Sequence, residues 1–200
     1  MLVPIELYGL TQRMGHLSPD LAIGWQIGKY VHEFFDGLQE VRIAVAAEGD
    51  AAFALSYLSR EHGCYGQVTV TETPRPWDFL FYHAVTGTAL HFTLIRKHIV
   101  LSQGLRSLEP HLAMDKPAVV EIYRTGLDLL VESILKRPVD SFCKIRQIRC
   151  RPLLQTAENN STIRCCRCGK SSFVQNAWDI EGQICCQTCS GLEPAWFMYH

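Results

Sequence analysis

The chain has 200 residues, of which 48% are hydrophobic and 20% are charged. This composition is typical of a folded protein and excludes global disorder, and the length suits one ordinary domain with a small appendage. The formal net charge of -1 gives no overall positive field that would draw the protein to nucleic acid or to an anionic membrane. No apolar run approaches the roughly 18 residues that a membrane-spanning helix needs.

Cysteine usage indicates the expected compartment. The N-terminal stretch MLVPIELYGLTQRMGH lacks a basic region followed by an apolar segment, so no secretory signal peptide is expected. Nine cysteines in a chain without such a signal indicate metal or redox chemistry rather than disulfides. The expected location is therefore the cytoplasm.

The first predicted element is the helix SPDLAIGWQIGKYVHEFFDG. Ser18 is a good N-cap for it, and Gly37 is a residue type that commonly ends helices. Gly24 and Gly28 lie four residues apart, so another element is expected to pack closely on that side of the helix.

Helices and strands continue to alternate along the chain. The sequence predicts a strand at 41–49, a helix at 50–63, a strand at 66–73, a hairpin at 77–100, a helix at 116–138 and a strand at 142–154. In the hairpin, the turn is expected near Thr86-Gly87, with His83 and His91 facing each other across it. This order predicts an α+β fold with helices packed on one face of a mixed sheet.

The segment LQTAENNSTI is polar, lacks aromatic residues and is typical of a linker. We therefore expect an α+β core domain over 1–154, a linker over 155–163 and a small cysteine-rich domain over 164–200.

Two CxxC pairs dominate the cysteine-rich domain. Cys165 and Cys168 form the first pair, Cys186 and Cys189 form the second, and 17 residues separate the pairs. This spacing lies within the pattern typical of a structural zinc site. Gly169 follows the first pair and supplies the permissive backbone that such a turn needs.

The remaining cysteines have no assigned role. Cys166 and Cys185 are each one residue out of register with the pairs, so their side chains are expected to point elsewhere. The roles of Cys143 and Cys150 stay open.

Zinc is the expected metal because four soft thiolates match its tetrahedral shell and leave no open position for catalysis. Iron, as a single ion or a cluster, is the alternative because all-thiolate sites also suit it. The sequence thus predicts a treble-clef-like finger that holds one structural Zn²⁺.

The finger has few basic residues of its own, which disfavours nucleic-acid binding. A basic stretch lies just upstream, however, so a zinc-finger regulator that contacts nucleic acid is an alternative function; its residues are Lys144, Arg146, Arg149 and Arg151. A surplus of apolar residues instead predicts that the finger docks on the body or on a protein partner; these are Phe173, Val174, Trp178, Trp196, Phe197 and Tyr199. Together with the glycine-spaced first helix, this surplus predicts a homodimer.

The stretch GHLSPDLAIGWQIG resembles the signature of the FmdE family, named for the E subunit of formylmethanofuran dehydrogenase, in which His-Gly-His-x-Cys-Pro-Gly-Leu-Ala begins the first helix. The matching residues are Gly15, His16, Leu17, Pro19, Leu21 and Ala22. A second family element, a Glu before a helix that ends in Thr-Gly-Cys, is similar to Glu48 through EHGC, where Gly63 and Cys64 match.

The resemblance implies that His16, Ser18 and Cys64 lie together at one cleft, where they would form a second metal site or a catalytic site. Met14 stands where the family has its first His, and Ser18 stands where it has a Cys. Serine is a weak ligand for soft metals, so the site is reduced to His16 and Cys64. Ser18 is equally explained as a helix N-cap, and His16 as a partner of a neighbouring carbonyl.

The expected function is that of a zinc-binding protein similar to this family, an accessory or binding protein rather than an independent catalyst. The resemblance implies a link to a molybdenum or tungsten pterin enzyme, although the tail and the altered motif suit a stand-alone relative. A small enzyme that uses Cys64 as nucleophile is a further alternative.

Overall fold

A computed structural model describes residues 5–37, 41–45, 49–61, 68–70, 78–83, 85–95, 99, 103–113, 116–152 and 161–190. Its helices are α1 (Ile5–Met14), α2 (Pro19–Phe35), α3 (Asp50–Glu61), α4 (Gln103–Arg106), α5 (Glu109–Leu112), α6 (Pro117–Lys136) and α7 (Gln187–Ser190), with 3-10 turns η2 (Val139–Ser141) and η3 (Val174–Asn176). Its strands are β1 (Val41–Val45), β2 (Val68–Val70), β3 (Asp78–His83), β4 (Thr88–Leu94), β5 (Cys143–Pro152), β6 (Thr162–Arg164), β7 (Ser171–Phe173), β8 (Ala177–Ile180) and β9 (Gln183–Cys186).

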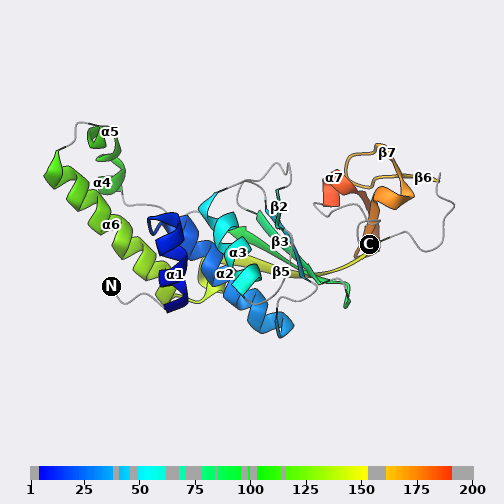
Figure 1. Ribbon diagram of the computed structural model, residues 1–200. Coiled ribbons are helices and arrows are strands. Elements are labelled where there is room, and N and C mark those ends of the chain that lie inside the picture. The colour runs from blue at the N-terminus through cyan, green and yellow to red at the C-terminus, as the bar shows by residue number, and fades with distance from the viewer. Residues whose placement is uncertain are drawn as a thin grey trace.

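The strands form a mixed sheet, so the predicted α+β fold is confirmed. Within the described residues, the sheet has seven strands in the order β2-β1-β3-β4-β5-β8-β9, and a separate small sheet joins β6 to β7. β1 and β2 run parallel, whereas the other neighbours are antiparallel. Figure 1 shows α6 with α4 and α5 at one end of the molecule and the cysteine-rich part at the other.

The two faces of the sheet carry different cores. Side chains alternate between faces along a strand, and in β3 Phe79 and Phe81 join the helical core whereas Leu80 and Tyr82 join a second cluster. The first core contains buried residues of α1, α2, α3 and α6. The second contains residues of β8 and β9, so the helices cover one face and the cysteine-rich part covers part of the other.

Helix α2 lies at the centre of the helical layer, and its ends follow the sequence signals. The Ser18 hydroxyl accepts a hydrogen bond from the Leu21 amide at 3.1 Å, which confirms the N-cap. At the other end Asp36 adopts the left-handed conformation, with φ 54°, and Gly37 donates its amide to the His32 carbonyl at 2.8 Å. Both ends are therefore set by local chemistry.

The glycine face of α2 is filled by α3, as the spacing predicts. A Cβ atom on Gly24 would lie 2.5 Å from the backbone oxygen of Ala51, and one on Gly28 would lie 2.4 Å from Leu58 Cδ1. This face is used inside the chain, so it no longer supports the predicted homodimer. The dimer and the cytoplasmic location stay predictions.

Replacing Gly24 with alanine is expected to lower the free energy of unfolding by about 1–3 kcal/mol, because the new methyl group meets backbone that has no rotamer to move. Urea denaturation measures the loss. Gly104→Ala in α4 is the matched control, since no atom lies within 4 Å of a Cβ built there. Equal stability of the two variants would contradict the close packing of α2 on α3.

The register of the hairpin corrects one expectation. His83 pairs with Thr88, and His91 pairs with Leu80. The predicted His83–His91 pair is wrong because the turn is centred closer to His83, with Gly87 at φ 66°.

In the part of the chain that the structure describes, no helix is both long and apolar enough to span a membrane.

Candidate metal centre

The first CxxC pair lies in the turn between β6 and β7. The amide of Gly169 donates to the Cys165 carbonyl at 2.9 Å, and the Cys165 amide donates to the Lys170 carbonyl at 2.9 Å. Gly169 has φ 70°, a conformation that costs glycine little. These bonds close a tight turn that places both sulfur atoms on one side.

The second CxxC pair follows the β8–β9 hairpin. Its two-residue turn has positive φ at Glu181 (53°) and at Gly182 (83°), the pattern of a type I′ turn. Cys186 ends β9, and Cys189 lies in the short helix α7. The order of knuckle, hairpin and helical turn matches the treble-clef-like arrangement expected from the sequence.

The sulfur atoms of Cys165, Cys168, Cys186 and Cys189 lie within 4.8 Å of one another. The Cys168 and Cys186 sulfurs are 3.8 Å apart. In a tetrahedral zinc site with metal–sulfur bonds of about 2.3 Å, the sulfurs are about 3.8 Å apart. The four cysteines chosen from the spacing are thus those that converge, and their geometry fits a four-coordinate ion.

Backbone amides prepare one of the four thiols for metal binding. Burial opposes ionisation of the Cys165 thiol, but backbone hydrogen bonds to its sulfur outweigh that cost and lower its pKa to about 6. The donors are the amides of Cys168, Cys186 and Arg167. Burial, followed by the neighbouring thiols, raises the pKa of Cys189. A cation is therefore needed to bring the whole set to the thiolate form.

The two knuckles are also joined by a side chain. Arg167, between the first two cysteines, donates from Nη1 to the Cys189 carbonyl at 2.9 Å. This bond occupies one of the carbonyls that α7 leaves without a partner at its end. It holds the second knuckle beside the first.

The cysteine-rich part is continuous with the main sheet. We call its described residues, 161–190, the finger module. β8 pairs with β5 through Cys150 and Ile180 and through Arg151 and Asp179. Trp178 is 1% exposed, and its ring lies 5.2 Å from the Tyr82 ring in an edge-to-face arrangement. The module therefore packs against the body. Of the tail aromatics, those beyond residue 190 lie outside the described residues.

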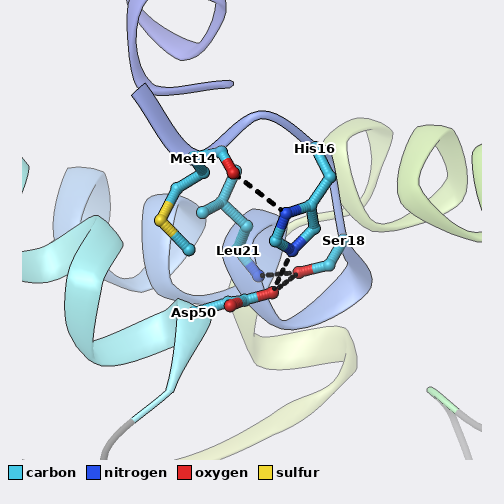
Figure 2. Close-up of polar contacts among 5 residues, drawn as sticks. All are labelled: Met14, His16, Ser18, Leu21 and Asp50. Atoms are coloured by element: carbon cyan, nitrogen blue, oxygen red, sulfur yellow. Dashed lines mark hydrogen bonds and ion pairs between the residues drawn. The ribbon is translucent and has the colours of Figure 1, made fainter. Parts of the chain in front are cut away.

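The side chains of His16 and Ser18, in the motif that precedes α2, both contact Asp50, which is not part of the family motif. His16 Nε2 lies 3.0 Å from Asp50 Oδ2, and the Ser18 hydroxyl donates to the same oxygen. Figure 2 shows both side chains pointing to Asp50 at the start of α3. Cys64 lies outside the described residues, so the predicted His16/Ser18/Cys64 site stays a prediction.

Both ring nitrogens of His16 face acceptors. Nδ1 lies 3.2 Å from the Met14 carbonyl, and Nε2 faces the Asp50 carboxylate. The hydrogen bond with Asp50, followed by that with Met14, raises the pKa of His16 above its usual 6.5. Nearby, burial and then the charge of Asp50 raise the pKa of Asp20. Both ring nitrogens therefore act as donors when the ring is protonated.

The His16–Asp50 pair predicts a pH dependence. Because the folded-state pKa of His16 is raised, its stabilising contribution is complete below pH 6.5 and is lost as the pH rises through the folded value. The contribution is small because the His16 side chain is 55% exposed. We expect Asp50→Asn to move the His16 pKa down toward its usual value. An NMR titration of the ring, assigned with His16→Gln, measures it, and an unchanged pKa would contradict the pair.

Comparison with known proteins finds similarity to a solved structure. No family model matches the chain, and no curated protein matches it. The chain is similar to a tungsten formylmethanofuran dehydrogenase FmdE-like protein from Syntrophus aciditrophicus, with 16% identical residues and a TM-score of 0.49. The alignment covers 92% of this chain and 90% of that chain.

The basic stretch upstream of the finger module does not form one surface. Lys144 and Arg146 lie at even positions of β5, whereas Arg149 lies at an odd position. Alternation along the strand directs Arg149 to the face opposite that of Lys144 and Arg146. Arg151 also lies opposite Asp179 of β8.

Two groupings have no counterpart among the sequence-based predictions. The sequence marks Asp50 only as the start of a helix, and it does not predict the contact between Cys166 and Cys185, whose sulfurs lie 3.4 Å apart. Only the contact between Cys166 and Cys185 has a local signal in the sequence. Cys166 directly follows Cys165 and Cys185 directly precedes Cys186, so each is displaced by one residue toward the segment between the two CxxC pairs.

Proposed function

We propose that the protein binds zinc, and that one structural Zn²⁺ held by Cys165, Cys168, Cys186 and Cys189 stabilises the finger module. The observation that carries this proposal is the convergence of four sulfurs within 4.8 Å. A metal held by four thiolates has no position left for water or substrate, so the ion would maintain structure rather than perform catalysis.

Zinc is preferred to iron on the chemistry of the donor set and the spacing. Two CxxC pairs separated by 17 residues are typical of structural zinc sites. Zinc, when bound, would supply positive charge that offsets the mutual repulsion of the thiolates. The chain's own part is to hold the sulfurs in place and to aim backbone amides at Cys165.

Elemental analysis of the purified full chain tests this proposal. We expect one zinc per chain and no absorption bands from iron–thiolate bonds. Two zinc ions per chain would show that a second site also binds metal, and His16 and Cys64 are the candidate ligands for it. Iron at one equivalent, or no bound metal, would overturn the proposed zinc site.

For the whole protein we propose an accessory role of the kind that the sequence resemblance implies, with a protein partner or a second copy of the chain docked on the finger module. The module exposes apolar side chains that suit such contacts: Phe173 is 49% exposed and Ile184 is 37% exposed. A nucleic-acid regulator is the alternative, and a filter-binding assay with a salt titration separates the two. We expect no binding that falls steeply with salt; a steep slope would indicate phosphate contacts.

A further inference from the structure

Two cysteines that are not among the metal ligands lie side by side in the finger module. The Cys166 and Cys185 sulfurs are 3.4 Å apart. Their backbones are also adjacent, because the Cys166 amide donates to the Ile184 carbonyl at 2.8 Å. Neither sulfur belongs to the group of four that converges on the metal position.

The two thiols differ in access to solvent. Cys185 is 0% exposed and lies opposite Trp178 in the β8–β9 hairpin. Cys166 lies on the surface of the first knuckle and is exposed. A reagent in solution therefore meets Cys166 first, and Cys185 is reached through it.

We propose that Cys166 and Cys185 form a thiol–disulfide exchange site, separate from the metal ligands, whose substrate class is a low-molecular-weight disulfide. A disulfide bond is about 2.05 Å long, so the two sulfurs need to approach by about 1.4 Å from their separation of 3.4 Å. Because Cys166 is exposed and Cys185 is buried, this movement falls to the Cys166 side chain.

The exchange has two balanced steps. The Cys166 thiolate attacks one sulfur of the small disulfide, whose S–S bond breaks and releases one thiol after it takes up a proton. The Cys185 thiol then gives up its proton as its sulfur attacks the Cys166 sulfur of the mixed disulfide, and the departing thiolate takes up a proton and leaves as the second thiol. Two protein thiols are oxidised, and one small disulfide is reduced to two thiols.

The bond would tie the two metal-binding knuckles together, because Cys166 follows the ligand Cys165 and Cys185 precedes the ligand Cys186. When one cysteine ligand detaches from the zinc ion, the disulfide would hold it near the ion, where its effective concentration is high. We expect zinc transfer to a chelator to slow by a factor on the order of ten in the oxidised protein. Only this expected effect on zinc transfer rests on the proposed zinc site; the exchange reaction itself does not.

The test treats the full-length, zinc-loaded protein with glutathione disulfide, followed by alkylation of the remaining thiols under denaturing conditions and mass spectrometry. We expect the wild type to form a Cys166–Cys185 disulfide with no attached glutathione. Cys185→Ser is expected to accumulate glutathione on Cys166, and Cys166→Ser is expected to show neither product. Cys143→Ser, which changes a buried cysteine in β5, is the matched control and should behave as the wild type.

Three outcomes would overturn the inference. They are a glutathione adduct that persists on wild-type Cys166, oxidation that falls first on the four metal ligands, and a protein disulfide that still forms to the same extent in Cys166→Ser. Zinc is counted in the same samples before oxidation. An absence of zinc would count against the proposed function, whereas the disulfide map tests the exchange site whether or not metal is bound.

Discussion

Cys165→Ser is expected to lose the metal and to unfold the finger module, whereas Cys166→Ser, at the adjacent position, is expected to keep both. Cys165 is 2% exposed and belongs to the converging set, but the Cys166 sulfur lies outside that set. Metal content and the rate of limited proteolysis within 161–190 measure the difference.

The expected effect is large because the finger module is small. Segments below about 40 residues rarely fold on a hydrophobic core alone. In zinc-finger peptides, the binding of structural zinc contributes about 10–16 kcal/mol to folding. The serine hydroxyl is a poor ligand for a soft site, so most of this contribution is lost. A Cys165→Ser protein with one tightly held metal and a protease-resistant module would refute the four-cysteine assignment.

Trp178→Ala is expected to lower the free energy of unfolding by about 3–5 kcal/mol, the usual cost of removing a large buried aromatic side chain. Trp178 is 1% exposed and packs on Tyr82 of β3, so its loss opens a cavity between the finger module and the sheet. Urea denaturation, followed by circular dichroism of the whole chain, measures the change.

Phe173→Ala is the matched control, because Phe173 lies in the same module but is 49% exposed. Its cost should stay below about 0.5 kcal/mol, as for an exposed site away from special features. If Trp178→Ala also fell in that range, the module would not be packed on the sheet in solution.

Local signals carry the features that the sequence predicts well. The Ser18 cap, the glycine contact at Gly24 and the two CxxC turns all depend on groups within a few residues of each other or on one helix face. Helix α1 is not among the predicted elements, although its buried Leu7 and Leu10 lie three residues apart. The segment is short and is interrupted by Gly9, so its helical signal is weak.

The domain arrangement depends on contacts that are remote in sequence. The polar linker predicts a domain boundary, and the surplus of apolar residues predicts only that the finger docks on the body or on a partner; β5 of the core in fact pairs directly with β8, and both contribute to one cluster with Tyr82. Linker composition reports the solvation of the connecting segment. It carries no information about whether the strands on either side of it pair with each other.

The sequence by itself predicted which four cysteines converge, because the CxxC turns fix sulfur positions within each pair through local backbone geometry. Only the tertiary structure decided that His16 and Ser18 share the Asp50 carboxylate and that Cys166 lies beside Cys185. Those residues are 34, 32 and 19 positions apart, respectively. Helix packing and strand register bring such residues together, and neither can be deduced from the residues that lie between them in the sequence.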